Sequence, residues 1–541
     1  MNTTVKALKK RISVAKRGIP ADLVLKGAMV VNVFTGNIQE NDIAISEGVI
    51  AGVGLDYHGK EEVDIAGKWM VPGLILLVHG TTAIVSDPHE IANVMGLEGI
   101  RFMLEESRSI PFDIFFMAPS CVPATNLETA GATLNATDLT VLMGDEQVLE
   151  KIAFFRDKVL DGHCPSLSGY DLQAYLSSGI RSDHETTVRS EGLEKVKSGM
   201  MLMIREGTSA KNLEELLPLV NSDNSRRFCF VSDDLHAEDI QHRGHLNFML
   251  KKAVDLGLDP VTAIQLVTLN PAEYFGLQDR GAIAPGYRAD ITVLEDPDDF
   301  EVSSVYKDGR MVINKGELIG FPFNEIEMPL DQPKPLNIAL LTPDSFRIPH
   351  VGGKARVIEL IPGQITTRML YEKTKSEGGW VVADIKSDIL KLCVVERHKA
   401  SGHVGLGLVK GFGLKHGAIA SSVAHDSHNV IVVGVSDEAI FKAVEIVRDM
   451  GGGLAAVRDN RTVLAKIPLE IAGLMSRQPL DTVVKQLQAI KNAASALGCA
   501  LEEPFMALSF LALPVIPELK LTDMGLVDVN RFEIVPLFTV A

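Results

Sequence analysis

Three short segments combine histidine and carboxylate side chains in a pattern that could bind a metal ion. They read DGHCP, SDHE and SDD, and each follows an apolar run. Imidazole nitrogens and carboxylate oxygens hold the divalent metals that activate water. A single loop histidine is more often a hydrogen-bonding residue, but three such segments in chain order favour a metal site. We therefore predict that His163, His184 and Asp233 are metal ligands.

The acidic residues of these segments could also perform acid–base chemistry. Asp233 could accept a proton from an attacking water and pass it to the leaving group, because a water beside a divalent cation is already acidified. Glu185 could protonate or orient a ring nitrogen of a substrate, and a salt-bridge role is an equal alternative. We interpret Arg205 and Glu206 as a buried ion pair under the site, and Cys164 as a packed free thiol.

The three segments lie in a stretch, residues 71–280, that alternates apolar β-type runs with amphipathic helical runs. This alternation predicts a parallel sheet with helical crossovers. Apolar runs that end in polar residues are typical of a (β/α)8 barrel, in which the strand ends converge on one active site. Seven runs fit: VPGLILL, TTAIVSDPHE, FDIFFMAPS, KVLDGHCP, GIRSDHE, MLMIREG and RFCFVSDD. The eighth, expected near LTVLMGDE, is not found.

The flanks of this stretch predict two further domains. Residues 1–70 and 281–325 are both rich in short β-type runs separated by glycine turns, so we expect them to form one composite β-domain. Residues 326–335 are proline-rich and predict a linker. Residues 336–541 again alternate β-type and helical runs and predict a C-terminal α/β domain. The AHDSHN segment of this domain we interpret as structural or pocket-closing, because adjacent Ser, His and Asp rarely form a triad.

Composition excludes several classes of protein. The net charge of −17 argues against a nucleic-acid partner, which usually meets a basic surface. The five cysteines are scattered and form no CxxC pair, which is typical of a reducing compartment. No uncharged run is long enough to span a bilayer, and no signal peptide is recognisable. We therefore expect a cytoplasmic enzyme that does not bind membranes.

Longer stretches of the chain resemble the bacterial adenine deaminase family of the amidohydrolase superfamily. They include DPHEIANVMG, DGHCPSLSG, GIRSDHETT, MIREGTSAKNL, FVSDDLH, GFGLKHGAIASSVAHDSHN and KIPLEIAGLMS. The resemblance implies a metal-dependent barrel, a composite β-domain and a C-terminal domain of the family's own. It also implies a hydrolase that acts on a C–N bond of a cyclic amidine, converting adenine and water to hypoxanthine and ammonia. Manganese or iron is the implied metal, and a small purine is the implied substrate.

Site residues carry over by position within these motifs. His163, His184 and Asp233 fall on metal-site positions of the family. Four further residues fall on motifs that are expected to line the substrate pocket, namely His89, Glu90, Arg205 and Glu206. A symmetric homodimer is expected for an enzyme of this size.

The chain departs from the family pattern at two places. After VPGL the family has a strand ending in His-x-His, whereas here the chain passes directly to LVHGTT, so His79 belongs to the following loop. A Glu-bearing segment before GDE is also missing. What remains could hold one metal at best. Two alternatives therefore stay open: a catalytically impaired homologue with a binding or oligomerisation role, and a related cyclic-amide or aminopurine hydrolase.

Overall fold

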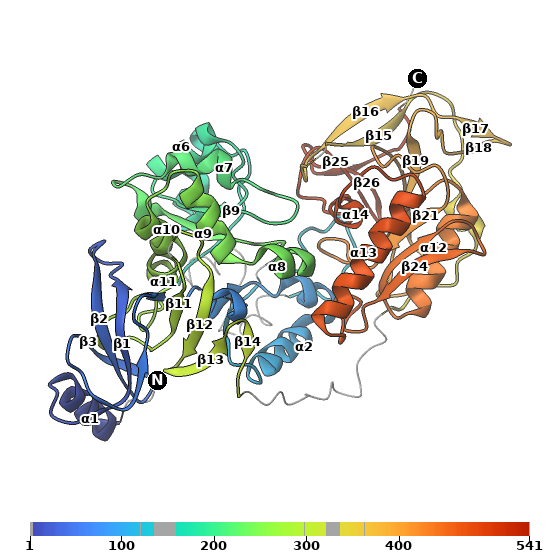
Figure 1. Cartoon of the computed structure of the whole chain (residues 1–541). Helices are drawn as coiled ribbons and strands as arrows, with labels where there is room; N and C mark the ends of the chain where they lie inside the picture. Colours follow the sequence, from blue (N-terminus) through green and yellow to red (C-terminus); the bar gives the residue numbers. More distant parts are fainter. Residues whose placement is uncertain are drawn as a thin grey trace. The chain divides into compact units, whose positions relative to one another are not determined.

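The computed structural model describes residues 4–119, 121–134, 158–296, 298–320, 336–361 and 363–539. The chain divides into two compact units (Figure 1). The first unit contains Met1–Ser86, Glu105–Met117 and Gln147–Ile326, and the second contains Asp87–Leu104, Ala118–Glu146 and Glu327–Ala541. The LTVLMGDE segment and the predicted linker at 326–335 lie outside the described residues.

The largest sheet of the first unit combines strands from both flanks of that unit. Its order is β14-β13-β12-β11-β5-β1-β2-β3, with β4 pairing with β1. The short strand β5 joins the two halves, because it runs parallel to β1 on one side and antiparallel to β11 on the other. The strand bounds are β1 (Ala21–Val31), β2 (Ile38–Ser46), β3 (Val49–Gly54), β4 (Gly59–Asp64), β5 (Trp69–Pro72), β11 (Ile291–Leu294), β12 (Val302–Lys307), β13 (Arg310–Asn314) and β14 (Glu317–Leu318). Helix α1 (Val5–Ala15) packs Val14 against this sheet.

Five parallel strands of the first unit lead to the polar segments. Strand β6 (Ala83–Ser86) pairs with β7 (Asp113–Phe116), and β9 (Met201–Arg205) lies between β8 (Ser182–Asp183) and β10 (Phe228–Val231). All five residues of β9 are buried, as expected for a parallel strand covered on both faces. Together with the surrounding helices, these strands confirm the predicted α/β class. The covering helices include α5 (Gly169–Ser177), α6 (Arg189–Lys197), α7 (Leu213–Leu216), α8 (Ala237–Arg243), α9 (Leu246–Asp255), α10 (Pro260–Val267) and α11 (Leu269–Tyr274).

Two of the seven apolar runs do not form the expected barrel strands. In VPGLILL the strand β5 ends at Pro72, and it belongs to the composite sheet because β1 and β11 occupy both of its edges. The chain then turns into the short 3₁₀ helix η1 (Leu77–His79). The described residues of KVLDGHCP, 158–165, form no strand. The five described parallel strands that lead to the polar segments thus form a two-stranded and a three-stranded sheet.

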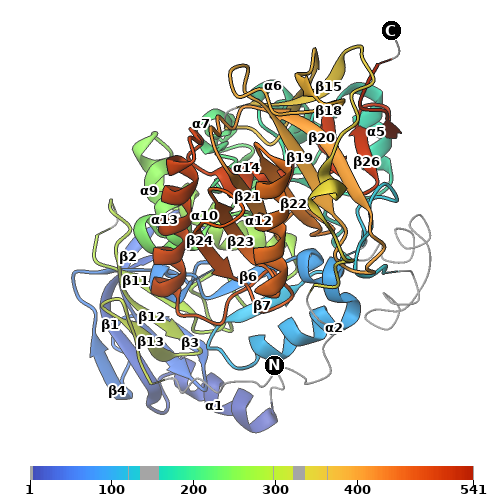
Figure 2. The same ribbon diagram turned by 90° about the vertical axis from the view of Figure 1, so that its right-hand side faces the viewer.

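The second unit is built on a sheet of order β16-β15-β20-β19-β22-β21-β23-β24. The side chains of β22 alternate between two cores: Val430 and Val432 face α12, while Ile431 and Val433 share a core with α13 and α14. Figure 2 shows α12 (Asp437–Asp449) and α13 (Leu480–Ala496) beside this sheet. The strand bounds are β15 (Ala355–Leu360), β16 (Thr367–Glu372), β19 (Ile389–Val395), β20 (Val404–Lys410), β21 (Ala418–Ser421), β22 (Val430–Gly434), β23 (Gly453–Val457) and β24 (Val463–Pro468).

Smaller elements complete the second unit. Helix α2 (His89–Ser107) belongs to the second unit as far as Leu104, although this segment precedes most of the first unit in sequence. The other elements are η4 (Pro343–Phe346), β17 (Ser376–Glu377), β18 (Trp380–Val381), α14 (Pro504–Phe510), β25 (Leu519–Thr522), β26 (Gly525–Asp528) and β27 (Glu533–Val535). Strands β25, β26 and β27 form an antiparallel sheet.

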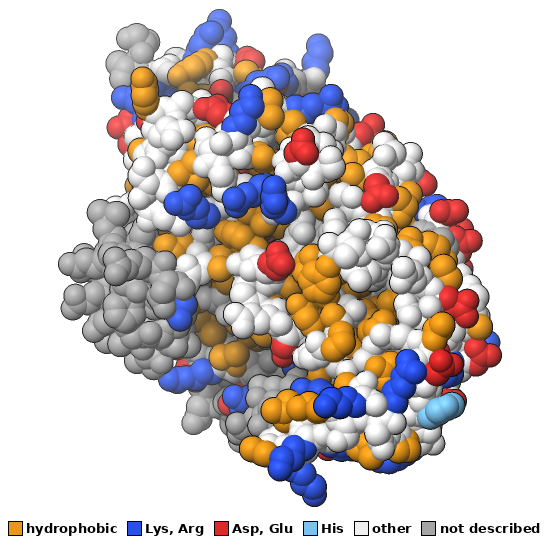
Figure 3. All heavy atoms as spheres, turned by 90° about the vertical axis from the view of Figure 1, so that its left-hand side faces the viewer, with side chains coloured by type: hydrophobic (Ala, Val, Ile, Leu, Met, Phe, Trp, Pro, Cys, Tyr) orange, Lys and Arg blue, Asp and Glu red, His pale blue; other side chains and the backbone are white. Residues whose placement is uncertain are grey.

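On the face drawn in Figure 3, Lys and Arg side chains are scattered among apolar and acidic side chains. Among the described residues, none of the helices has both the length and the apolar character that crossing a membrane requires.

Candidate functional site

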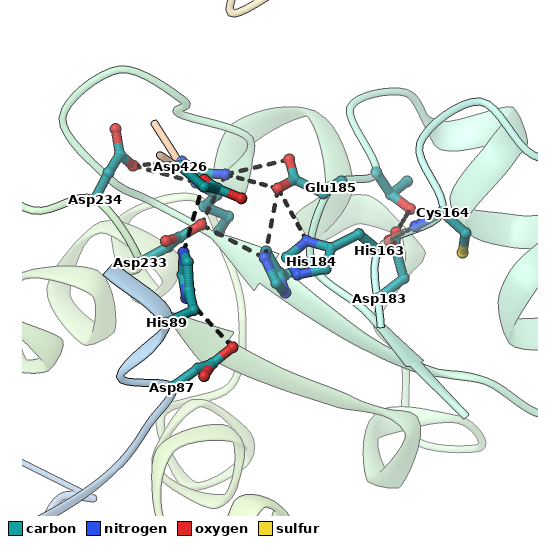
Figure 4. A network of polar contacts seen from close by, with 12 residues as sticks. Asp87, His89, His163, Cys164, Asp183, His184, Glu185, Asp233, Asp234 and Asp426 are labelled. Atoms are coloured by element: carbon teal, nitrogen blue, oxygen red, sulfur yellow. Dashed lines mark hydrogen bonds and ion pairs between the residues drawn. The ribbon is translucent and has the colours of Figure 1, made fainter. Parts of the chain in front are cut away.

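The ends of three parallel strands bring the candidate residues of the first unit together. His184 and Glu185 follow β8 directly, Arg205 is the last residue of β9, and Asp233 follows β10 by two residues. Because parallel strands end at the same edge of a sheet, these side chains converge there. Figure 4 shows His184, Glu185 and Asp233 close to one another. Asp233 has a positive φ of 50°, which turns the chain sharply after β10.

A buried lysine fixes the end of β8 and the DGHCP segment. Lys195 of α6 donates to Asp183 (3.0 Å) and to the carbonyl oxygen of Cys164 (2.7 Å). The Cys164 backbone N–H in turn donates to Asp183 (2.9 Å). His163 precedes Cys164 and His184 follows Asp183. These bonds therefore hold His163 and His184 side by side. The thiol of Cys164 is buried, and burial raises its pKa to about 12, so it is an unreactive neighbour.

The two imidazoles share one carboxylate. His163 Nδ1 and His184 Nε2 each lie 3.5 Å from Glu185 Oε1. His184 Nε2 also lies 3.6 Å from Asp233 Oδ2. The two imidazole rings meet edge to face, with centroids 4.5 Å apart. The predicted ligands His163, His184 and Asp233 therefore meet in one cluster, and Glu185 lies at its centre.

Arg205 holds the carboxylates of this cluster in place. Its Nη1 lies 3.2 Å from Glu185 Oε2 and 2.7 Å from Asp233 Oδ2. Its Nη2 lies 2.7 Å from Asp234 Oδ1, which also accepts from Nε at 3.2 Å. The Arg205 side chain is only 3% exposed. A planar guanidinium with fixed donors is suited to aligning several carboxylates at once.

The electrostatics of the cluster follow from burial and from these contacts. Burial alone would lower the pKa of His184, but the hydrogen bond with Glu185 and the charge of Asp233 outweigh it and raise that pKa to about 9. Burial alone would raise the pKa of Glu185, but hydrogen bonds from His163 and His184 and the charge of Arg205 hold it far below its ordinary value. Both shifts favour the charged form of the group, so the cations and the carboxylates of the cluster stabilise one another.

The donor set fits a divalent metal. One ligand atom from each of His163, His184 and Glu185 can be chosen so that all lie within 4.8 Å of one another. Two imidazoles and a carboxylate suit manganese, iron and zinc. Glu185, predicted from the sequence as a catalytic group, is thus placed as closely to the histidines as the predicted ligand Asp233 is to His184.

Glu206, the residue after Arg205, points elsewhere. Its Oε1 accepts from Lys252 (2.6 Å), and its Oε2 accepts from the Leu213 backbone N–H (3.2 Å). The side chain is 1% exposed. These contacts join the end of β9 to α7 and α9, so the predicted Arg205–Glu206 ion pair is replaced by separate pairs for the two residues.

His89 and Glu90 belong to the second unit and meet residues of the AHDSHN segment. His89 Nε2 lies 3.9 Å from Asp426 Oδ1, and Glu90 Oε1 lies 2.5 Å from His425 Nδ1. Glu90 Oε2 contacts His428 Nε2. Sequence reasoning gave AHDSHN a structural or pocket-closing role and missed this grouping. The spacing of two histidines three residues apart with an aspartate between them was the available signal.

Comparison with known proteins identifies the family. The amidohydrolase family model matches residues 75–312, and the adenine deaminase C-terminal domain model matches residues 364–533. An adenine deaminase of Desulfatibacillum aliphaticivorans is 48% identical, and the alignment covers 97% of this chain and 99% of that protein. The chain belongs to the adenine deaminase family. An adenine deaminase of Geobacillus kaustophilus is 42% identical, over 98% of this chain and 99% of that protein.

The alignments also show a difference in length from the adenine deaminase family. They extend over 567 and 574 positions, more than the 541 residues of this chain, so these relatives contain segments without a counterpart here. Longer relatives are expected if the two ligand-bearing segments are missing from this chain. Among solved structures, a β-aspartyl dipeptidase of Fervidobacterium islandicum AW-1 aligns with a TM-score of 0.44 and 17% identity, over 56% of this chain and 100% of that chain. The amidohydrolase family uses divalent metals, and the described donor groups match that requirement.

Proposed function

We propose that this chain catalyses the hydrolytic deamination of adenine to hypoxanthine and ammonia. The supporting observation is the 48% identity to an adenine deaminase along nearly the whole length of both proteins. The cluster of His163, His184, Glu185 and Asp233 in the first unit supplies side chains suited to this reaction. Adenine carries its amino group on a ring carbon, and water must replace that group.

The residues that would hold the metal are His163 and His184, with Asp233 as the carboxylate ligand and Glu185 close enough to share this role. The metal is manganese or iron, in line with the mixed imidazole and carboxylate donors. When bound, it would lower the pKa of a water molecule so that the water can attack at neutral pH. Both imidazoles must be neutral to donate a lone pair, so metal binding and protonation of His184 compete.

The two protons of the attacking water need two acceptors. Asp233, which is 36% exposed, accepts one and delivers it to the departing ammonia. Glu185 carries the other to a ring nitrogen of the purine. Because hydrogen bonds from His163 and His184 and the charge of Arg205 keep Glu185 ionised, Glu185 can donate a proton only after it has accepted one from the water. The two transfers together convert water and adenine to ammonia and hypoxanthine with no proton left over.

The remaining predicted pocket residues divide into two groups. Arg205 orients Glu185 and Asp233, so we propose it as a positioning residue. Glu206 is engaged by Lys252 and the backbone of α7, so we propose a structural role for it. We leave His89 and Glu90 out of the catalytic set because their contacts are with His425, Asp426 and His428.

We further propose the domain division predicted from the sequence, with residues 1–70 and 281–325 as one domain, 71–280 as the catalytic domain and 336–541 as the C-terminal domain. The pairing of β5 with both β1 and β11 supports the first of these. A cytoplasmic homodimer is the proposed form of the enzyme. Light scattering of the purified chain measures its mass, and a monomer at micromolar concentration would contradict the dimer.

The decisive test combines substrate turnover with metal content. We expect the manganese- or iron-loaded chain to release ammonia from adenine, and His184→Ala to abolish this release and to lower the bound metal. His242→Ala is the matched control, because His242 is an exposed histidine of the same unit. Unchanged turnover in His184→Ala would remove His184 from the site. Ammonia release from other aminopurines but not from adenine would replace the proposed substrate.

A further inference from the structure

The second unit contains its own group of histidine and carboxylate side chains. Ligand atoms of His89, Glu90 and Asp426 lie within 4.8 Å of one another. Glu90 also belongs to a second such group with His425 and His428. His89 and Glu90 open helix α2, and the other three residues lie in the loop between β21 and β22. All five residues belong to the second unit.

The three residues of the first group point toward one place. His89 Nε2 lies 3.4 Å from Glu90 Oε1 and 3.9 Å from Asp426 Oδ1. His89 Nδ1, on the other side of the ring, lies 3.3 Å from Asp87 Oδ2, and Figure 4 shows His89 between Asp87 and Asp426. An imidazole with a carboxylate beside one nitrogen and the metal at the other is the usual arrangement of a metal-bound histidine.

The other two histidines support Glu90 from behind. His425 Nδ1 lies 2.5 Å from Glu90 Oε1, and His428 Nε2 contacts Glu90 Oε2. The Ala424 backbone N–H donates to His428 Nδ1 (3.2 Å). In neutral His428 the proton is therefore on Nε2, which faces Glu90. His428 is thus a residue that orients the carboxylate rather than a ligand.

One imidazole nitrogen beside Glu90 is buried without a partner in the protein. Within the described residues, His425 Nε2 is buried without a hydrogen-bond partner, whereas Glu90 Oε2 and His428 Nε2 face each other. The His428 side chain is 1% exposed. Buried polar atoms normally have such partners, and an exception calls for an explanation such as a bound water molecule or ion. Glu90 and Asp426 are moreover two carboxylates close together, and a cation bound between them would reduce their repulsion further than the neighbouring imidazoles do.

The solvent exposure of the candidate ligands differs from that of the residues that orient them. The side chains of His89 and Glu90 are 31% and 33% exposed, and that of Asp426 is 17% exposed. An ion could reach these three from solvent and keep water molecules as additional ligands. One imidazole and two carboxylates suit manganese and iron, and also zinc.

We propose that His89, Glu90 and Asp426 form a second metal-binding site, made of residues of the second unit alone, which takes a divalent first-row transition metal. Asp87 orients His89, and His425 and His428 orient Glu90. The site requires no contribution from the His163–His184 cluster, so metal binding here is measurable whether or not the chain deaminates adenine.

Manganese binding to the full chain tests the proposal, with free Mn²⁺ followed by electron paramagnetic resonance. The background is the double variant His163→Asn/His184→Asn, which removes the cluster of the first unit. We expect this background to bind about one Mn²⁺ per chain, and Asp426→Asn in the same background to remove that binding. His416→Gln is the matched control, because His416 is an exposed histidine of the second unit. His428→Gln should weaken binding about 10–100-fold without abolishing it, as expected for a residue behind a ligand.

Two outcomes would overturn the proposal. One is a background variant that keeps the circular dichroism of the wild type and binds no Mn²⁺. The other is a folded Asp426→Asn variant that retains the bound ion. Should the double variant fail to fold, Asp426→Asn in the otherwise unchanged chain is expected to lose one equivalent of Mn²⁺ relative to wild type. An unchanged stoichiometry there would equally refute the site.

Discussion

Arg205 offers the sharpest test of how the first-unit cluster is held together. Replacing it with methionine removes the guanidinium but keeps much of the apolar stem. Two of its partners, Glu185 and Asp234, are 12% and 7% exposed, so they would be left as nearly buried, unpaired carboxylates. Asp233 is 36% exposed and its pair is screened by solvent, so we leave it out of the sum.

The magnitude follows from the two buried pairs. At separations of this kind each pair contributes roughly 4 kcal/mol of attraction at an effective dielectric constant near 20. Burying the guanidinium and the carboxylates costs several kcal/mol and offsets much of this gain. Removing one partner of a buried pair typically destabilises a protein by about 3–5 kcal/mol. For a unit of this size that corresponds to a fall of roughly 10 °C in Tm.

The assay can be confined to the first unit. The chain has two tryptophans, Trp69 in the first unit and Trp380 in the second. In a Trp380→Phe background, fluorescence during urea unfolding therefore reports on Trp69. Arg189→Met is the matched control, because Arg189 and Glu215 form a pair of which both members are about half exposed. We expect that control to change the free energy of unfolding by less than about 1 kcal/mol.

Turnover and stability should fall together in the Arg205 series. Arg205→Lys keeps the charge but cannot present the same fork of donors, so we expect an intermediate loss of stability and a larger loss of kcat. If Arg205→Met unfolded within 1 kcal/mol of the wild type, the carboxylates would be stable without the guanidinium. The account of Arg205 as the residue that positions Glu185 would then be wrong.

Three further variants test other parts of the fold. Lys195→Met should leave Asp183 buried without its cation and lower the free energy of unfolding by about 3–5 kcal/mol, measured by urea denaturation, and an unchanged midpoint would contradict the role of this pair. Burial lowers the pKa of Lys520 to about 7, so the unfolded chain binds one more proton than the folded chain between about pH 7 and 10, and stability should rise with pH across that window. Lys520→Met should flatten this rise by about 1.4 kcal/mol per pH unit, and parallel pH curves for the two proteins would refute it. Gly405→Ala would place a Cβ 1.8 Å from the Thr522 carbonyl oxygen, so the second unit should unfold at a clearly lower temperature by calorimetry, and an unshifted transition would contradict the close approach of these strands.

Much of the first-unit site can be predicted from local patterns in the sequence. Apolar runs followed by polar residues predict strands whose ends converge, and β8, β9 and β10 place Glu185, Arg205 and Asp233 at one edge. The α/β class follows from the same alternation of runs. His163 could be assigned from its motif, although its segment forms no strand.

The remaining features depend on contacts that no local pattern encodes. The helix RSEGLEKVK reads as a charged, solvated helix, yet Lys195 is fully buried because Asp183 and the Cys164 carbonyl lie above it. The partners of Arg205 lie on two different loops, after β8 and after β10, so their meeting is a property of the tertiary fold. Likewise Glu90 and His425 are far apart in sequence, and nothing near either residue predicts that they touch.

The position of β5 in the composite sheet has a consequence for biosynthesis. Trp69–Pro72 emerges from the ribosome early, but one of its edges can pair only with Ile291–Leu294, which is made more than two hundred residues later. Until then the nascent chain carries an open strand edge, the kind of surface on which chains aggregate or recruit chaperones. Long separations between paired strands also slow folding. The nascent chain is therefore most prone to aggregation while the ribosome is still translating the catalytic segment.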